Sequence, residues 1–355
     1  MDTLKHGRER KKLKALIYPA LLLALLSAAA VAISIGAVSY SFREIGGIFL
    51  ELFGLPCRIN IEAVKKDILL QLRMPRVVLA GAVGASLATA GATFQGLFRN
   101  PMADSYVIGV SSGAALGAVA AMLIGLPAAW GGIGAVPLFA FAGGVLTLLL
   151  VYRMARVGNE VPVMPLLLAG IAISAFLSAL VSLLTYFADD KLHQVMFWIM
   201  GGLGGATWMK IKIMVPYTLL GFGCVYFYHR ELNAMLFGEE TAHHLGIDIE
   251  KVKKILLAGS SLMVAAAVST SGIIGFVGLV VPHFIRLLIG PDHRHLLPAS
   301  ALLGAVLLIV TDTLARTIIT PRELPVGIIT ALLGAPLFVY LLRKRKKLRY
   351  FDLTE

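Results

Sequence analysis

The stretch from residue 163 to residue 187 reads VMPLLLAGIAISAFLSALVSLLTYF and contains no charged residue. A helix needs about 20 apolar residues to cross the hydrocarbon core of a bilayer, so this stretch predicts a membrane-spanning helix. The whole sequence has the same character. Of its 355 residues, 58% are hydrophobic and 15% are charged, whereas soluble domains carry about 25% charged residues. The composition therefore predicts an integral membrane protein.

Ten stretches of this kind occur along the chain. They cover residues 15–38, 76–97, 104–125, 133–152, 163–187, 210–229, 253–269, 274–290, 296–315 and 324–342. Lipid offers the backbone no hydrogen-bond partner, so we expect every stretch to be a helix. The spacing of the second to fifth stretches resembles that of the seventh to tenth. Because five crossings separate the two sets, we expect an inverted repeat, as in many transporters. The predicted fold is all-α, with ten transmembrane helices.

The net charge of +12 is concentrated at the two ends of the chain. The two terminal clusters are Lys5, Arg8, Arg10, Lys11, Lys12 and Lys14, and Arg343, Lys344, Arg345, Lys346, Lys347 and Arg349. Each cluster lies beside an apolar stretch, which is typical of charges that stay on the cytoplasmic side of a membrane and face anionic lipid. We therefore predict cytoplasmic tails at 1–14 and 343–355, a membrane domain at 15–342, and no nucleic-acid partner.

Motifs of a nucleotide-binding site or of a common metal-dependent catalytic site are absent from the sequence. We find no phosphate-binding loop of the form G-x-x-x-x-G-K-[ST], and no H-E-x-x-H or C-x-x-C. The two cysteines, Cys57 and Cys224, imply neither a disulfide framework nor a metal site. The predicted spans are also almost free of charge at mid-depth, where ion-coupled carriers keep their coupling groups. The pattern favours a pathway that a partner drives.

Two other classes of protein stay open at this point. An ion-coupled secondary transporter of a small solute would need a charged coupling group inside the membrane. An intramembrane enzyme would need paired polar catalytic groups, and His283 is the only candidate. His283 follows Pro282, and we expect Pro282 and Pro336 to break or kink their helices.

A row of hydroxyl groups runs along the predicted span 163–187. Ser174, Ser178 and Ser182 recur every fourth residue, and Thr185 follows, so the hydroxyls share one face of a helix. They can simply bond their own backbone. They also suit a water-filled path for a large, weakly held solute. In the span 104–125, glycines recur every fourth residue and predict close helix packing.

The segment between the sixth and seventh spans predicts a binding surface for a soluble partner. Residues 230–248 read RELNAMLFGEETAHHLGID. Gly238 can end a first short helix, Glu239 and Glu240 suit the first turn of a second, and Gly246 can close it. A pair of helices lying on the membrane surface, the other interpretation, would carry more basic than acidic residues.

The predicted outer loop 39–75 contains several arginines among acidic residues. They indicate either a docking face for an acidic partner or ordinary solvated charge.

Eight short motifs in order resemble the permease subunits of the cobalamin, iron-siderophore and haem ABC importers, from about residue 65 to 342. The motifs are RMPR at 73–76, GATFQG at 91–96, NPMAD at 100–104, GVSSGA at 109–114, the segment 238–246, SGIIGFVGL at 271–279, VPH at 281–283 and ELPVG at 323–327. The resemblance implies a homodimer with its pathway at the dimer interface, two copies of an ABC ATPase subunit that binds ATP and Mg²⁺, and an extracytoplasmic substrate-binding protein. It further implies that this chain binds no cofactor or metal, is not an enzyme, and resides in the cytoplasmic (inner) membrane of a prokaryote.

The resemblance also assigns roles to single residues. Those expected to meet acidic residues of the binding protein are Arg73, Arg76 and Arg316. Those expected to contact the ATPase are Gly238, Glu239, Glu240, Ala242, Leu245 and Gly246. Those expected at the inner gate or along the pathway are Asn100, Pro101, Met102, Val163, Met164, Ser174, Ser178 and Ser182. The predicted function is import of a metal chelate, with a ferric siderophore as the first choice, and haem or cobalamin next.

Overall fold

The computed structural model describes residues 2–36, 38, 40–52, 54, 62–104, 106–126, 134–319 and 321–351, with side chains between residues 16 and 340 except Phe42 and Phe49. The helices are α1 (Asp2–Ser34), α2 (Phe42–Leu52), α3 (Ala63–Asp67), η1 (Ile68–Arg73), α4 (Met74–Leu97), α5 (Val110–Ile124), α6 (Ala135–Ala155), α7 (Val163–Tyr186), η3 (Asp189–Lys191), α8 (Leu192–Ile199), α9 (Trp208–Phe227), α10 (His229–Met235), α11 (Glu239–His244), α12 (Ile249–Ser271), α13 (Val277–Ile289), α14 (His293–Thr317) and α15 (Val326–Phe351). The basic clusters continue α1 and α15 in the backbone, but their side chains, like Cys57, lie outside the described residues.

Each of the ten predicted spans corresponds to a helix. Six helices are long and apolar enough to cross a membrane, and α9 with α10 forms a seventh candidate that bends by 55°. The three remaining spans correspond to the shorter apolar helices α5, α13 and the first part of α15, Val326–Tyr340. The all-α membrane fold predicted from the sequence is thus confirmed.

Two predicted boundaries were wrong because an irregular segment precedes a short helix. The stretch 104–125 becomes helical only at Val110, and the stretch 274–290 only at Val277. Gly109 and Phe276 precede these helices with φ of +85° and +67°, values that end any right-handed helix approaching from the N-terminal side. Such backbone is tolerated at membrane depth when it is buried in protein, and Ile108 and Ile274 beside it are both 1% exposed.

The proline prediction was also wrong in part. Pro282 and Pro336 both lie inside helices that continue on either side of them. Neighbouring groups in membrane proteins can compensate for the amide that proline lacks, so a proline need not end a helix. The large bend lies elsewhere, between α9 and α10 at Tyr228.

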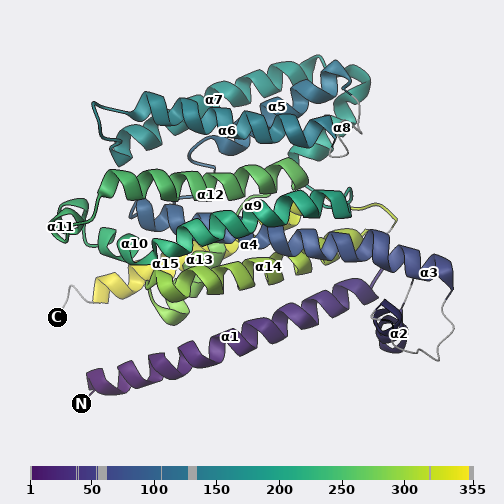
Figure 1. Cartoon of the computed structure of the whole chain (residues 1–355), viewed down its shortest axis with the longest axis horizontal. Helices are drawn as coiled ribbons and strands as arrows, with labels where there is room; N and C mark the ends of the chain where they lie inside the picture. Colours follow the sequence, from purple (N-terminus) through teal and green to yellow (C-terminus); the bar gives the residue numbers. More distant parts are fainter. Residues whose placement is uncertain are drawn as a thin grey trace.

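The helices form a layered bundle with α4, α12 and α14 at its centre (Figure 1). Helices α5, α6 and α7 form a layer on one side of α12, and α1 runs along α14 on the other side (Figure 1). The start of α1 and the end of α15 lie at one end of the bundle, together with α10 and α11 (Figure 1). We call this the terminal end. The opposite end, which holds α2, α3 and α8, is the far end.

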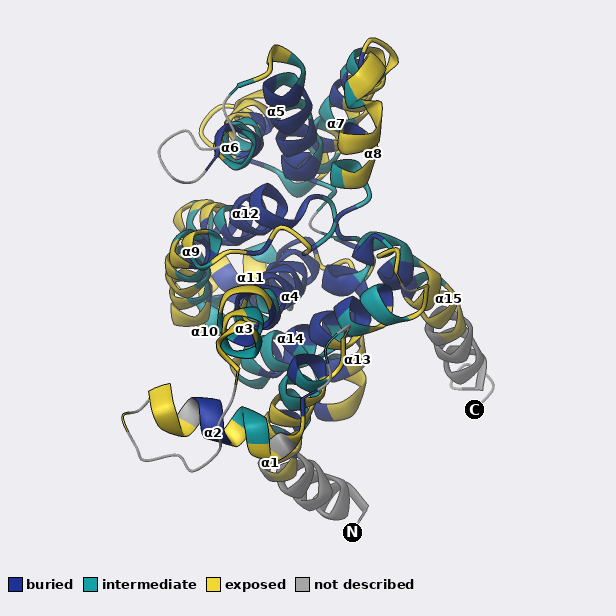
Figure 2. Cartoon of the chain, turned by 90° about the vertical axis from the view of Figure 1, so that its right-hand side faces the viewer, coloured by how far each residue is buried: buried dark blue, intermediate teal, exposed yellow. Residues whose placement is uncertain are grey.

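Burial differs sharply between the central and the outer helices (Figure 2). In the α3–α4 span and in α12, 78% of the most apolar window is buried, whereas in α7 only 22% is buried. Helix α15 also exposes large apolar side chains, among them Leu332 and Tyr340. The outer faces of α7 and α15 are therefore open to lipid or to another protein chain.

Small residues let the central helices approach closely. A Cβ atom added to Gly84 of α4 would lie 2.2 Å from the carbonyl oxygen of Gly304 in α14, and one on Gly91 would lie 1.9 Å from that of Gly278 in α13. The predicted glycine interface of α5 is confirmed as well, because Gly113 lies against Gly143 of α6 in the same way. Backbone contact at this distance excludes any side chain.

The helix neighbours have the pairing that an inverted repeat requires. Helix α4 packs on α14 and α13, and its counterpart α12 packs on α6 and α5. The two short helices α5 and α13 occupy equivalent places, each after an irregular segment.

Candidate functional site

Arg73 lies at the far end, where α1 ends. Its Nη1 donates to the carbonyl oxygens of Ile33 (2.6 Å) and Ser34 (3.1 Å), its Nη2 donates to that of Val38, and its guanidinium lies 4.7 Å from the centre of the Tyr40 ring. Only 7% of Arg73 is exposed. The residue thus caps the carbonyl groups at the C-terminus of α1.

The backbone before α4 explains why Arg73 and Arg76 point to different helices. Proline at position 75 has no amide hydrogen, so the α-helical ladder cannot continue through it. The preceding residues form the π-helical turn η1, in which the amide of Met74 donates to the carbonyl of Leu69. Such turns are frequent at functional sites. Here the turn lets Arg73 face α1 while Arg76 faces α14.

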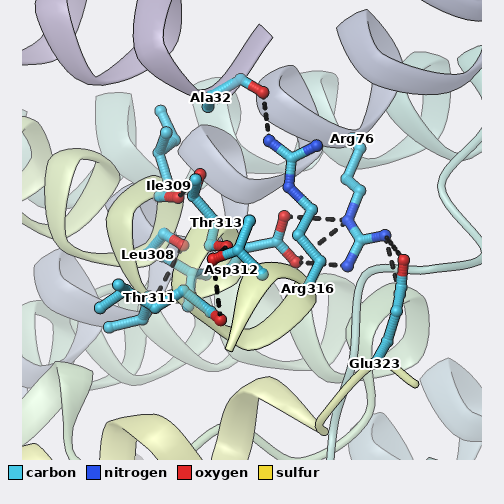
Figure 3. A network of polar contacts seen from close by, with 11 residues as sticks. Ala32, Arg76, Leu308, Ile309, Thr311, Asp312, Thr313, Arg316 and Glu323 are labelled. Carbon is cyan, nitrogen blue, oxygen red and sulfur yellow. Dashed lines mark hydrogen bonds and ion pairs between the residues drawn. The ribbon is translucent and has the colours of Figure 1, made fainter. Parts of the chain in front are cut away.

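Arg76 binds two carboxylates at the far end (Figure 3). Its Nε donates to Asp312 Oδ1 (3.1 Å) and Oδ2 (2.9 Å), and its Nη2 donates to Asp312 Oδ1 (2.9 Å). Its Nη1 donates to Glu323 Oε1 (3.0 Å) and Oε2 (2.9 Å). Arginine has the fork geometry for this two-sided binding, and the planar group cannot turn without breaking it.

Arg316 completes this group of charges (Figure 3). Its Nη2 donates to the carbonyl oxygen of Ala32 in α1, and its Nε has no hydrogen-bond partner among the described groups. The three arginines predicted from the resemblance therefore lie together, on or beside α1, α4 and α14. Each already has partners within the chain. Their role in docking stays a prediction.

The hydroxyl row of α7 borders a cavity of about 380 Å³. The cavity is lined by Ser112, Ala115, Ser178, Val181, Ser182, Thr185, Met196, Ile199 and Ile273. The predicted bonding of the hydroxyls to their own backbone is confirmed, since Ser182 Oγ and Thr185 Oγ1 donate to carbonyls one turn earlier (3.0 and 2.7 Å). Both residues also line the cavity, and their role in a path for the solute stays a prediction. Ser174 does not line it. Its buried Oγ faces Gly109 of α5 instead.

The segment after α9 forms the two short helices predicted at the terminal end, α10 and α11. Gly238 precedes α11 with φ +119°, and Gly246 follows it with φ +81°. The amides of Gly246 and Ile247 donate to the carbonyls of His243 (2.9 Å) and Ala242 (3.2 Å). This is a Schellman motif, in which glycine at the left-handed position closes the helix.

The surface of this helix pair is partly apolar. Phe237 is 79% exposed and Leu245 is 68% exposed, whereas Ala242 between them is buried. Large apolar side chains at this exposure, grouped on one short segment, are typical of a surface that contacts another protein or a membrane.

An acidic cavity of about 560 Å³ lies beside α11. Its lining residues are Glu160, Glu239, Glu240, His243, Gly246, Ile247, Asp248, Ile249 and Glu250. The buried Lys253 of α12 holds this region together, because its Nζ donates to Glu239 (2.8 Å), Glu250 (3.2 Å) and the carbonyl of Val161 (3.3 Å). Glu239 therefore joins α11 to α12 in addition to lying in the first turn.

The side-chain amide of Asn233, an uncharged group, joins α10 to the start of α14. The Nδ2 of Asn233 donates to Asp292 Oδ1 (2.8 Å), and its Oδ1 accepts from the backbone amide of His293 (2.9 Å). The same oxygen lies 2.8 Å from His293 Nδ1. His293 is fully buried against Gly96 of α4. Asn233 thus ties α10 to α14, and His293 in turn packs on α4.

The predicted inner-gate residues also lie toward the terminal end. Asn100 Oδ1 accepts from the amide of Met102 (2.9 Å), which fixes the turn around Pro101. Met102 (54% exposed) and Met164, at the start of α7 (65% exposed), both present apolar side chains on the surface, and Val163 is half-buried. The turn is close to the helix pair, since Arg99 Nη1 lies 3.8 Å from a Cβ placed on Gly238.

Sequence reasoning missed the partners of the predicted residues. Asp312 lies four residues before Arg316, a spacing that signals an ion pair on a helix, yet it pairs with Arg76 of a distant helix. Glu323 was noted only as part of a motif. Asn233 carries no such signal, because its partners lie at the start of α14. For Lys253, only Glu250 lies at helical spacing on the same helix, whereas Glu239 and Val161 lie elsewhere.

The fold and these sites are those of a multi-span transport protein: membrane-length helices, an uncharged hydroxyl-lined cavity and an exposed apolar surface at one end. The chain belongs to the FecCD transport family, whose model matches residues 21–344.

Named relatives are similar over most of the chain. The chain is 47% identical over 294 residues to the cobalamin import system permease protein BtuC of Halobacterium salinarum, covering 83% of this chain and 78% of the relative. It is 41% identical over 331 residues to the hemin transport system permease protein HmuU of Yersinia pestis, covering 89% and 92%. A solved structure, described as an inward-facing conformation of a metal-chelate-type ABC transporter, matches with a TM-score of 0.81 at 32% identity over 93% of this chain and 99% of that one.

Proposed function

We propose that this chain is the permease subunit of a binding-protein-dependent ABC importer that moves a metal chelate into the cytoplasm of a prokaryote. One observation carries the proposal: α10 and α11, rigidly closed by a Schellman motif, expose Phe237 and Leu245 at one end of a membrane bundle. A chain without a phosphate-binding loop needs a partner that hydrolyses ATP, and this surface suits such a partner.

The proposed assembly contains two copies of this chain, two ATPase subunits with ATP and Mg²⁺, and one extracytoplasmic binding protein. The terminal end then faces the cytoplasm, so that both basic clusters lie on the side expected for them. The far end faces outward and presents Arg76, Arg316 and, behind them, Arg73 to acidic residues of the binding protein. The inner gate includes Asn100 to Met102, with Val163 and Met164.

The pathway runs between the two copies, along α7. Ser178 and Ser182 are exposed on the single chain and border the 380 Å³ cavity, which supports a path lined by weakly interacting hydroxyls. Ser174, with its buried Oγ, supports the contact of α7 with α5 instead. A large chelate held tightly by a binding protein needs few specific contacts on the way.

The relatives indicate only the chemical class of the transported substrate. The names of two relatives refer to cobalamin and hemin, so a corrinoid and haem are tested before a ferric siderophore, the first choice from sequence alone. The ion-coupled alternative has less support. Among the described residues, the buried side chains of arginine, lysine and acidic residues are those of Arg73, Lys253 and Asp312, and all three lie near helix ends and are bound to other groups.

The test begins with affinity purification of this chain from its native membranes and identification of its partners by mass spectrometry. We expect an ATPase subunit at one copy per copy of this chain, together with ATP-dependent uptake of a chelate in proteoliposomes. Phe237→Asp should remove the ATPase subunit. The control is Phe227→Asp, which changes an exposed phenylalanine of α9 before the bend and tests whether the same substitution at another exposed phenylalanine has that effect. Transport without ATP by this chain alone would contradict the proposal.

A further inference from the structure

The two carboxylates on Arg76 differ in how firmly they are held. Asp312 lies within α14, is 3% exposed in its side chain, and occupies the Nε–Nη2 edge of the guanidinium. Glu323 occupies Nη1 and its side chain is 48% exposed. One partner of Arg76 is therefore part of the core, and the other lies at the surface (Figure 3).

The backbone around Glu323 does not depend on its carboxylate. Glu323 lies between α14 and α15, and the amide of the next residue, Leu324, donates to the carbonyl of Ala315 (2.9 Å). Pro325 and Val326 beyond it are buried. The hydrogen bonds described for the Glu323 carboxylate all come from Arg76. The side chain can therefore turn into solvent while the connection between the helices stays in place.

The surrounding charges favour a carboxylate at the position of Glu323. Three guanidinium groups, those of Arg73, Arg76 and Arg316, lie near two carboxylates, so positive charge is in excess. The other two arginines bind carbonyl oxygens of α1 rather than acids.

We infer that Glu323 is a built-in placeholder: it holds Nη1 of Arg76 until an acidic side chain of the docking protein replaces it, while Asp312 remains in place. This inference rests on the proposed docking of a binding protein at the far end. The exchange replaces one carboxylate by another, so Arg76 keeps its hydrogen bonds and its orientation throughout. The released Glu323 returns to water at little cost because it is half-exposed.

A placeholder has two consequences for docking. The guanidinium is already ordered and partly desolvated, which lowers the entropic cost of binding. The competing carboxylate also weakens the bound state, so the binding protein leaves more readily after it has delivered its ligand. Removing the competitor should therefore tighten docking, which is the opposite of what the loss of a supporting residue would do.

The experiment titrates the binding protein recovered with the complex, fluorescently labelled and free of its ligand, onto the full complex in lipid nanodiscs. Glu323→Gln should lower the dissociation constant by about threefold to fivefold, the upper part of the range for one exposed ion pair. The matched control is Glu51→Gln, which removes a carboxylate at the same end that pairs with Lys66 rather than with Arg76. It should change the dissociation constant by less than about twofold.

The remaining outcomes separate the inference from the proposal beneath it. If Arg76→Gln weakens docking but Glu323→Gln does not tighten it, docking at the arginines holds and the placeholder is wrong. Equal tightening by Glu51→Gln and Glu323→Gln would also overturn it, because the effect would then be one of net charge. If Arg76→Gln leaves docking unchanged, the proposed docking site itself is wrong, and the inference falls with it. Thermal unfolding of Glu323→Gln, expected within about 2 °C of wild type, excludes misfolding as the cause.

Discussion

The two ends of α14 are fixed to their surroundings by different chemistry. At the far end Asp312 and Arg316 belong to a cluster of charges that reaches the surface at Glu323. At the terminal end the backbone of His293 and the carboxylate of Asp292 are bound by one neutral amide, Asn233. Helix α14 has 25 residues, so about 37 Å separates the two ends.

The difference teaches what each end is suited to do. Charges that are partly exposed can exchange one partner for another with little change in free energy, as docking and release require. The half-buried amide of Asn233, with its donor and its acceptor both in use, has no such alternative, so it holds α10 against the start of α14. The predictions below test the two ends, and the contact between them, in order of decreasing effect.

The largest effect is expected at the charged end, for Asp312→Ala. The change leaves Arg76 and Arg316 without the buried carboxylate, and breaking a buried pair on one side costs about 3–5 kcal/mol. Denaturant unfolding of the purified chain in detergent measures the loss. The double variant Arg76→Gln with Asp312→Asn should lose clearly less, because no unpaired charge stays buried.

Asp190→Ala is the control for this measurement, since Asp190 is an exposed acid at the same end. If Asp312→Ala and Asp190→Ala proved equally stable, the cluster would contribute nothing to the fold.

The contact between the ends is tested by Gly304→Ala. The new Cβ atom would lie 2.4 Å from the carbonyl oxygen of Gly84 and 2.5 Å from Ala88 Cβ, so α4 and α14 must separate. We expect a loss of about 1–3 kcal/mol in the free energy of unfolding, as for other overpacked cores. Gly223→Ala is the matched control, because Gly223 is also a helical glycine and has nothing within 4 Å of its added Cβ. A stable Gly304→Ala protein would show that the two helices can move apart freely.

At the neutral end, Asn233→Ala removes the hydrogen bonds to Asp292 and His293. The unpaired buried groups should cost about 1–3 kcal/mol. The informative readout is the number of chelate molecules transported per ATP hydrolysed, which should fall because α10 no longer moves α14. Asn159→Ala is the control, since Asn159 is an exposed asparagine that accepts only from Arg156. If Asn233→Ala transported as many chelate molecules per ATP as wild type, the bonds of Asn233 would have no role in coupling.

The smallest effect is expected in α2, at the rim of the charged end. Ser41 and Glu44 form a capping box, in which the Ser41 amide donates to Glu44 Oε2 (2.8 Å) and the Glu44 amide to Ser41 Oγ (3.2 Å). The hydrogen bond from the Ser41 amide, followed by that from Lys65, lowers the pKa of Glu44 from 4.5 to about 2. A lowered pKa stabilises the fold above pH 4.5, and this contribution is lost as the pH falls towards 2.

Hydrogen exchange of the α2 amides measures this effect. In wild type, protection should be constant from pH 7 to pH 5 after correction for the intrinsic rate, and should fall only near pH 2 to 3. In Glu44→Gln it should be about twofold to fivefold lower from pH 7 to pH 5, and the difference from wild type should disappear near pH 2. Arg43→Gln, on the same helical turn, should leave it unchanged. If the α2 amides were equally protected in Glu44→Gln and Arg43→Gln, the capping box would not stabilise α2.

Much of the fold could be predicted because the membrane imposes it locally. Every backbone amide in lipid needs a partner within its own segment, so an apolar stretch such as 163–187 specifies a helix without knowledge of the rest of the chain. Gly238 and Gly246 are likewise local signals, since the backbone at these positions requires positive φ. The start of α5 was missed because Tyr106, Val107 and Ile108 just before it are as apolar as a helix would be.

The partners of the functional residues were decided by tertiary structure alone. The sequence determined the class of fold, the short helix pair and the presence of arginines near the far end. It did not determine that Arg76 binds Asp312 and Glu323, which are 236 and 247 residues away. Those distances close because Gly84 and Gly304 let two helix backbones touch. A hydrophobic pattern specifies which face of a helix is buried, but the partner of a polar group depends on which helix packs there, and long-range packing decides that.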